Sequence, residues 1–129
     1  MSAPEEKPKP SVLMVDDESY ILDLMREGLG RDFEIETAAS AEEASLLTGT
    51  RKYDVIVCDQ IMPGENGLQF LMRLAEMQPH ARLIMMTGYI NPELLSRAMV
   101  LAGLSACLLK PVQVVEVKNA INAALAKPK

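Results

Sequence analysis

The sequence contains no tryptophan, and aromatic residues make up only 4% of its 129 residues. It has no excess of positive charge either, because 13 lysines and arginines stand against 18 aspartates and glutamates, for a net charge of −5. Non-specific binding to nucleic acid needs clustered positive charge, and stacking on bases needs aromatic side chains. The composition therefore argues against direct binding to nucleic acid.

The chain also lacks a long hydrophobic run, since none approaches the roughly 18 residues needed to cross a bilayer. Residues 1–10 carry proline and lysine where a signal peptide has an apolar segment. The two cysteines, Cys58 and Cys107, lie inside apolar runs without metal-ligand spacing, which is typical of small buried side chains in a reducing compartment. These absences argue against a secreted or membrane protein and favour a cytoplasmic one.

What is present fits one globular domain, with 49% hydrophobic and 24% charged residues. We expect a disordered N-terminal segment at residues 1–10, a domain at 11–126 and a short tail at 127–129. Five short apolar runs are predicted strands, at residues 11–15, 33–38, 53–58, 83–86 and 106–109. Amphipathic segments between and after them are predicted helices, at residues 20–30, 40–48, 68–78, 91–103 and 114–125.

Strands and helices that alternate in this way predict an α/β fold with a doubly wound parallel sheet. Continuous apolar runs support it, because parallel strands are covered on both faces. In the third helix we expect an inner face of Leu68, Leu71, Met72 and Ala75, preceded by a loop at 63–67. The nine methionines are interpreted as core packing residues.

Polar residues end four of the five strands: Asp16 and Asp17, Asp59, Thr87 and Lys110. The carboxyl ends of parallel strands share one edge of the sheet, where ligands bind. Three clustered carboxylates repel each other unless a cation lies among them, and Mg²⁺ prefers such oxygen ligands. Each residue alone also fits a solvated surface group, whereas their joint occurrence favours a site. The single histidine, His80, is interpreted as an exposed turn residue.

Together these polar residues resemble the motifs of a known protein family. The acid pair at 16–17, Asp59 with Met62-Pro63 and Gly67 behind it, Thr87-Gly88 and Lys110-Pro111 occur in the order and on the strands typical of a family. From about residue 11 to 126 the chain resembles the response-regulator receiver domain of bacterial two-component signalling, with its CheY-like, flavodoxin-like fold. The resemblance implies the strand order 2-1-3-4-5.

The resemblance also implies roles for these residues. Asp59 would accept a phosphoryl group from the phosphohistidine of a sensor kinase or histidine phosphotransfer protein, or from acetyl phosphate. Mg²⁺ would be held by Asp17, Asp59, the backbone carbonyl of Ile61 and, through water, Asp16. Thr87 and Lys110 would contact the phosphoryl group. The Lys110–Pro111 bond would be cis, although the sequence alone favours trans.

In this reading the chain is a switch and not an enzyme beyond its own phosphorylation and dephosphorylation. The last two helices and fifth strand would bind a downstream protein or output domain, or a second copy of the chain. Direct binding to nucleic acid or membrane is not expected. A free-standing receiver and a segment of a longer protein both fit the sequence.

Two positions, Cys107 and Leu104, depart from the family pattern; Leu104 stands where the family prefers Ala. Cys107 stands where the family has Tyr or Phe, so the usual coupling of Thr87 to an aromatic ring cannot operate. Tyr89 is a candidate replacement, although a half-exposed loop aromatic is the simpler interpretation. Ile61 and Tyr89 also lack an amide or carboxylate to orient water, which predicts slow dephosphorylation.

Three other functions are alternatives. Because Cys107 replaces the family's aromatic residue, one alternative is an adaptor protein that keeps the receiver fold and works without phosphorylation. A Mg²⁺-dependent aspartyl phosphatase of the haloacid-dehalogenase kind needs Asp-x-Asp after the first strand, whereas this chain has Asp-Asp-Glu at residues 16–18. A flavodoxin-like cofactor binder is disfavoured too, because these acids would repel a phosphate.

Overall fold

The computed structural model describes residues 8–59, 61–62, 65–88 and 92–128. The main sheet consists of β1 (Ser11–Val15), β2 (Glu34–Ala38), β3 (Val55–Asp59), β6 (Arg82–Thr87) and β7 (Leu104–Leu109). The helices are α1 (Ser19–Leu29), α2 (Ala41–Thr48), α3 (Gly67–Met77), α4 (Pro92–Leu101) and α5 (Val114–Ala126). A small hairpin pairs β4 (Ile61–Met62) with β5 (Glu65–Asn66).

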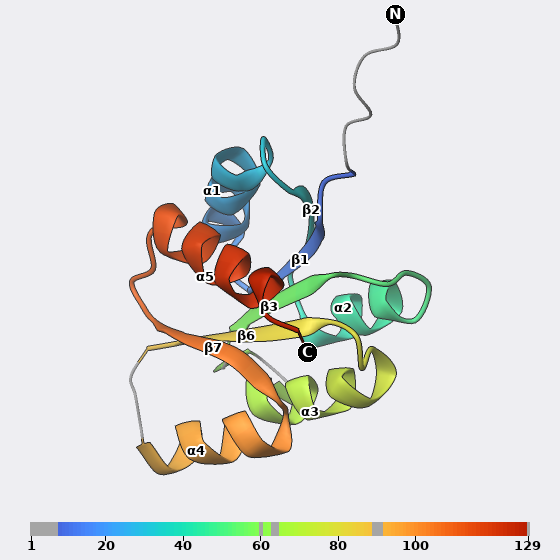
Figure 1. Ribbon diagram of the computed structural model, residues 1–129, viewed down its shortest axis with the longest axis vertical. Helices are drawn as coiled ribbons and strands as arrows, with labels where there is room; N and C mark the ends of the chain where they lie inside the picture. Colours follow the sequence, from blue (N-terminus) through green and yellow to red (C-terminus); the bar gives the residue numbers. More distant parts are fainter. Residues whose placement is uncertain (1–7, 60, 63–64, 89–91, 129) are drawn as a thin grey trace, which may run out of the picture.

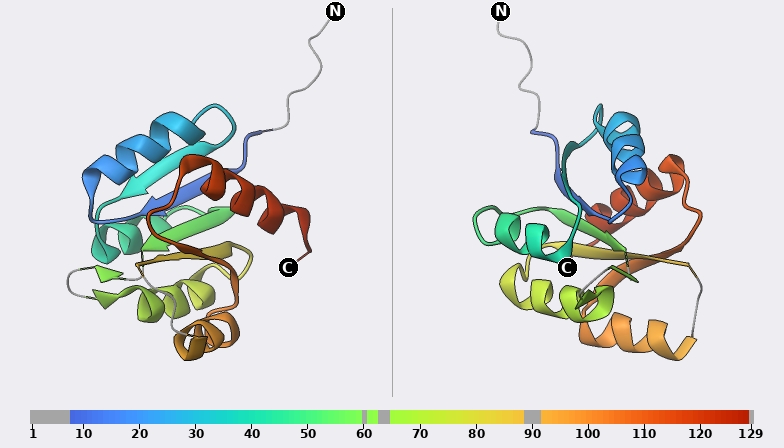
Figure 2. Two further views of the ribbon diagram at one scale, coloured as in Figure 1. Left: turned by 90° about the vertical axis from the view of Figure 1, so that its left-hand side faces the viewer. Right: turned by 180° about the vertical axis from the view of Figure 1, so that it is seen from behind.

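The sheet has the strand order β2-β1-β3-β6-β7, and every neighbouring pair is parallel. Helices α1 and α5 cover one face, and α2, α3 and α4 lie on the other (Figures 1 and 2). The predicted doubly wound sheet with the order 2-1-3-4-5 is therefore confirmed. The expected N-terminal segment lies mostly outside the described residues.

Each face of the sheet has its own hydrophobic core, because successive side chains of a strand point to opposite faces. In β1, Leu13 packs in the core under α2 and α3, whereas Val12 and Met14 pack in the core under α1 and α5. All three are fully buried. Burial on both sides explains why this strand reads as a continuous apolar run.

Some details of the sequence prediction are wrong. The inner face of α3 includes Phe70, Leu71 and Leu74, whereas Met72 is 36% exposed. The helix begins at Gly67, and positions 70, 71 and 74 follow the three- and four-residue spacing of one face. The predicted set at positions 68, 71, 72 and 75 has the same spacing, but the buried stripe is turned toward Phe70 and Leu74, which leaves Met72 at its edge.

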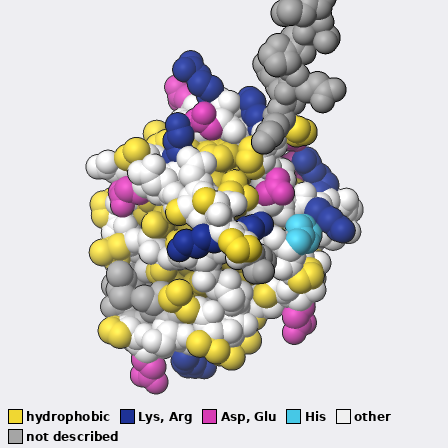
Figure 3. Space-filling model, viewed as in Figure 1, with side chains coloured by type: hydrophobic (Ala, Val, Ile, Leu, Met, Phe, Trp, Pro, Cys, Tyr) yellow, Lys and Arg dark blue, Asp and Glu magenta, His cyan; other side chains and the backbone are white. Residues whose placement is uncertain are grey.

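The interpretation of all methionines as core residues fails as well. Met77 and Met99 are 45% and 48% exposed, like Met72. The predicted loop at 63–67 also needs correction, because Glu65 and Asn66 pair with the strand before them. Strand β7 starts at Leu104, two residues earlier than expected. Figure 3 shows hydrophobic side chains scattered over one face of the molecule among charged ones.

Side chains cap the start of α2. The Ser40 hydroxyl accepts a hydrogen bond from the Glu43 amide (3.0 Å), and the Glu43 carboxylate accepts one from the Ala39 amide (3.1 Å). These bonds satisfy amides that have no partner within the helix. Among the described residues, no helix combines the length and apolarity needed to cross a membrane.

Candidate functional site

Four strands bring polar side chains to one edge of the sheet. Asp16 directly follows β1, Asp59 and Thr87 are the last residues of β3 and β6, and Lys110 directly follows β7. Backbone hydrogen bonds extend the pairing past the strands: the Asp16 amide donates to the Ala38 carbonyl (3.1 Å), and the Lys110 amide donates to the Thr87 carbonyl (2.7 Å). These main-chain hydrogen bonds therefore fix the backbone positions of Asp16 and Lys110 at the edge of the sheet.

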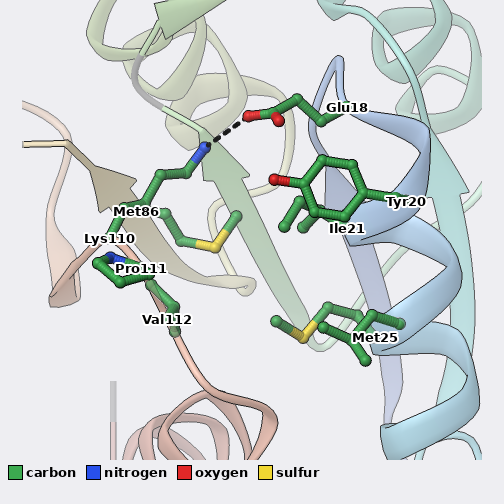
Figure 4. A pocket seen from close by; sticks show the side chains of 9 residues that line it. Glu18, Tyr20, Ile21, Met25, Met86, Lys110, Pro111 and Val112 are labelled. Atoms are coloured by element: carbon green, nitrogen blue, oxygen red, sulfur yellow. Dashed lines mark ion pairs between the residues drawn. The ribbon is translucent and has the colours of Figure 1, made fainter.

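The Lys110 ammonium lies among carboxylates at this edge. Its Nζ is 3.1 Å from Asp59 Oδ2, 3.3 Å from Asp16 Oδ2 and 3.9 Å from Glu18 Oε1; Figure 4 shows the ion pair with Glu18. The Lys110–Pro111 peptide bond is cis, as the resemblance implied. Asp16 and Asp59 are 0% and 6% exposed, so both are largely removed from water.

Burial and charge shift the proton affinities in this group. Burial raises the pKa of Asp16 above its usual value, although a hydrogen bond from the Glu18 amide (2.9 Å) and the charge of Lys110 act in the opposite direction. For Lys110, burial alone would lower the pKa, but the hydrogen bond to Asp59 and the charges of Asp16 and Asp59 raise it overall. Lys110 is therefore a fixed cation at neutral pH.

The carboxylates of Asp16, Asp17 and Glu18 form a candidate metal group, with one oxygen from each within 4.8 Å of the others. Asp16 is buried, and the other two are exposed. An all-carboxylate set with two solvent-facing members suits a hard ion that keeps part of its water shell, as Mg²⁺ does. The residues present therefore fit such an ion.

Glu18 was not among the predicted site residues. It directly precedes α1, its backbone amide hydrogen-bonds to Asp16, and its carboxylate approaches Lys110. The available signal was its position beside the acid pair in the short turn after β1. An acid just before a helix also fits a simple cap, so this position alone does not assign Glu18 to the site.

The other predicted residues lie as follows. Thr87 is 2% exposed at the end of β6. Ile61 belongs to β4, which starts two residues after Asp59. Cys107 is a free, half-buried thiol that pairs with Met85 in the sheet, and burial raises its pKa. Tyr89 lies outside the described residues.

His80 and Cys58 can also be placed. His80 is exposed in the turn before β6, as expected. Cys58 is a fully buried thiol in the core under α2 and α3, and it is not part of a disulfide. Neither side chain is therefore assigned to the polar edge of the sheet.

Asp16→Asn is expected to stabilise the metal-free protein by about 1 kcal/mol at pH 7, because an amide replaces a buried carboxylate. A thermal midpoint about 4 °C higher would measure this gain. The exposed Asp23→Asn on α1 is the matched control, with no change expected.

The dependence of the stability of the fold on pH follows from the raised pKa of Asp16. The folded state holds the proton of the Asp16 carboxyl more tightly than the unfolded state does. The contribution of this group to the stability of the fold therefore falls as the pH rises from 3.8, the usual pKa of the group, through the raised pKa. The amide of the Asp16→Asn variant carries no such penalty, so the advantage of this variant should grow across that window and stay constant above it. Equal stability of the two proteins at pH 7 would contradict the expectation.

Comparison with known proteins agrees with this arrangement. The model of a family described as the response regulator receiver domain matches residues 12–122. The chain belongs to this family. It is therefore a receiver domain of two-component signal transduction, and the resemblance found in its sequence is confirmed.

Individual relatives cover the receiver domain to different extents. The hydrogenase transcriptional regulatory protein HoxA of Cupriavidus necator is 38% identical over 101 residues, which are 78% of this chain and 21% of HoxA. The chemotaxis protein CheY of Halobacterium salinarum is 32% identical over 112 residues, which are 86% of this chain and 92% of CheY. The chain thus spans about a fifth of the length of HoxA and nearly all of this CheY.

A solved structure is similar as well. A response regulator of Burkholderia pseudomallei, with a phosphorylated aspartic acid, a calcium ion and citrate, is 28% identical and matches with a TM-score of 0.80. The match covers 93% of this receiver and 76% of that chain. The likeness extends over almost the whole receiver domain.

Proposed function

We propose that this receiver is a phosphorylation-dependent switch in which Asp59 accepts a phosphoryl group from the phosphohistidine of a sensor kinase or phosphotransfer protein. The observation that carries the proposal is the position of the Lys110 ammonium, 3.1 Å from Asp59 and 3.3 Å from Asp16 at the edge of the sheet. A nucleophile beside a fixed cation suits attack on an anionic phosphoryl group. The phosphorylated aspartic acid of the Burkholderia pseudomallei regulator supports the same chemistry.

The proposed reaction transfers one phosphoryl group from a nitrogen of the donor to an oxygen of Asp59. A carboxylate oxygen of Asp59 forms a bond to phosphorus while the bond from phosphorus to the donor imidazole nitrogen breaks. The imidazole keeps the electron pair of the broken bond and takes a proton from solvent. Lys110 pairs with the phosphoryl oxygens as their charge redistributes, and the Thr87 hydroxyl donates a hydrogen bond to one of them.

Asp17, Asp59 and the Ile61 carbonyl would hold a Mg²⁺ ion, with Asp16 contributing through water. When bound, such an ion supplies positive charge that neutralises the incoming phosphoryl group. Glu18 adds a further carboxylate beside this set, since its oxygen lies within 4.8 Å of those of Asp16 and Asp17. We therefore include Glu18 as a residue that tunes the affinity for the ion.

The proposed output is a shift between two arrangements of α4 and β7, driven when Thr87 moves toward the phosphoryl group. The unit that switches is residues 11–126, in a cytoplasmic protein. The shifted surface, formed by α4, β7 and α5, would bind a downstream protein, an output domain or a second copy of the chain. Tyr89 is the proposed replacement for the aromatic ring that Cys107 does not supply.

A second candidate function rests on Cys107. A half-buried thiol stands on β7 where the family has an aromatic ring, which favours an adaptor that needs no phosphorylation. The two functions differ in whether partner binding responds to phosphorylation.

The test is incubation of the chain with acetyl phosphate, with Mg²⁺ or with a chelator in its place, followed by intact mass spectrometry. We expect one phosphoryl group to be added with Mg²⁺ and very little with the chelator. The phosphorylated form should persist well beyond seconds at neutral pH, because Ile61 and Tyr89 cannot orient water. Equal addition in both conditions, or none in either, would contradict the proposal.

A further inference from the structure

A pocket of about 520 Å³ lies beside the phosphorylation site, between the start of α1 and the connection from β7 to α5. Figure 4 shows its lining side chains, with Lys110 and Glu18 at one end and Met25 at the other. The size falls within the range of small-molecule sites in proteins. Phosphoryl transfer to Asp59 does not require such a cavity, because a phosphoryl group needs only the edge of the sheet.

The walls of this pocket are mostly apolar. They are formed by the side chains of Ile21, Leu24, Met25, Met86, Pro111 and Val112. Met25 and Met86 are 0% and 1% exposed, so they are held by the core under α1 and α5. They form the buried floor of the pocket, whereas Leu24, which is 47% exposed, and Pro111 offer the apolar surface that a ligand can contact.

The polar end of the pocket is negatively charged. The carboxylates of Asp16, Glu18 and Asp59 lie within ion-pair distance of the Lys110 ammonium, which is closest to the two buried acids, and Asp17 lies beside Asp16 and Glu18. Glu18 is its most distant partner at 3.9 Å, and 46% of the Glu18 side chain is exposed. The Glu18 carboxylate can therefore accept a second cation from the pocket side.

Tyr20 supports this arrangement. Its side chain lines the pocket and is hydrogen-bonded to Glu18, which raises the pKa of the Tyr20 phenol. The Tyr20 phenol and the Glu18 carboxylate therefore lie together at the opening. An apolar chamber with an acid at its entrance is complementary to an amphipathic cation.

We propose that this pocket binds a small organic amine, with its apolar body over Leu24 and Pro111, above the buried Met25 and Met86, and its ammonium paired with Glu18. The inference goes beyond the proposed function and does not depend on phosphorylation. Because the amine would lie beside Lys110, its binding would be linked to the state of the site.

The experiment uses three probes with one shared ring: 2-phenylethylamine, 2-phenylethanol and phenylacetate. Each is titrated into the full, metal-free and unphosphorylated chain, and NMR follows the methionine methyl groups. We expect the Met25 and Met86 methyls to shift with the amine at millimolar affinity. The exposed methionines Met72, Met77 and Met99 are internal controls and should not shift.

The charge of the probe should decide the affinity. An ion pair with a half-exposed carboxylate is worth up to about 1 kcal/mol, so the alcohol should bind about fivefold more weakly than the amine and phenylacetate more weakly still. Glu18→Gln should bring the amine to the affinity of the alcohol. Equal affinity of the three probes for the natural chain would overturn the proposal.

A second measurement uses the absence of tryptophan from the sequence. Leu24→Trp places a fluorophore at the rim of the pocket, and Leu46→Trp on α2, 70% exposed in the natural chain, is the matched control. The amine should change the emission of the first variant only. Equal changes of emission in both variants would overturn the proposal, and so would the absence of a shift of the Met25 and Met86 methyls. The second result is also expected if the pocket binds a protein partner and no small amine.

Discussion

Replacing Asp59 by asparagine is expected to abolish phosphorylation by acetyl phosphate. The amide oxygen of asparagine carries no full negative charge, and an amide is a far weaker nucleophile than a carboxylate. The side chain keeps its size, so the buried position at the end of β3 remains filled. Intact mass spectrometry should show no added phosphoryl group, whereas the natural chain gains one.

The matched control for this variant is Asp23→Asn on α1, whose side chain is 74% exposed. This control should be phosphorylated like the natural chain. If Asp59→Asn still gained one phosphoryl group at a similar rate, another residue would be the acceptor and the proposed role of Asp59 would be wrong.

Lys110→Gln is expected to slow phosphorylation by about 10²–10³-fold, the usual cost of removing one group that stabilises charge in a transition state. The same change should strengthen Mg²⁺ binding by about tenfold, because the ammonium that now neutralises Asp16 and Asp59 is gone. Phosphorylation should become slower while Mg²⁺ binding becomes tighter, whereas a general loss of folding would weaken both. Stopped-flow phosphorylation and a Mg²⁺ titration would measure them.

Lys118→Gln is the control for that pair of measurements. Lys118 is an exposed lysine on α5 that pairs with Asp32 at 3.0 Å, so it matches the charge change without touching the site. Neither the rate nor the affinity should change. An unchanged rate in Lys110→Gln would show that Lys110 acts only in packing.

Much of this arrangement could be predicted from the sequence, for a physical reason. Strands buried on both faces must be continuously apolar, so the first polar residue after each run marks the edge of the sheet. Asp16, Asp59, Thr87 and Lys110 all follow this rule. The parallel order then brings these strand ends to a single edge.

Other features depend on packing that the sequence does not encode locally. Glu18 lies within 4.8 Å of the neighbouring acids because the turn before α1 folds back onto Asp16, which composition alone cannot show. Met72 fits the helical spacing of the predicted inner face, but this spacing allows two neighbouring stripes of α3, and packing buries the one with Phe70 and Leu74. The pocket between α1 and the β7–α5 connection arises from the distance between two elements that are far apart in the sequence.

The most direct test of the proposal locates the phosphoryl group. An acyl phosphate is reduced by borohydride to an alcohol, so phosphorylated aspartate becomes homoserine, which peptide mass mapping can locate. After treatment with acetyl phosphate and Mg²⁺, the account predicts homoserine at position 59 and unmodified aspartate at positions 16 and 17. Homoserine at 16 or 17, or phosphate retained on a hydroxyl or on His80, would contradict it.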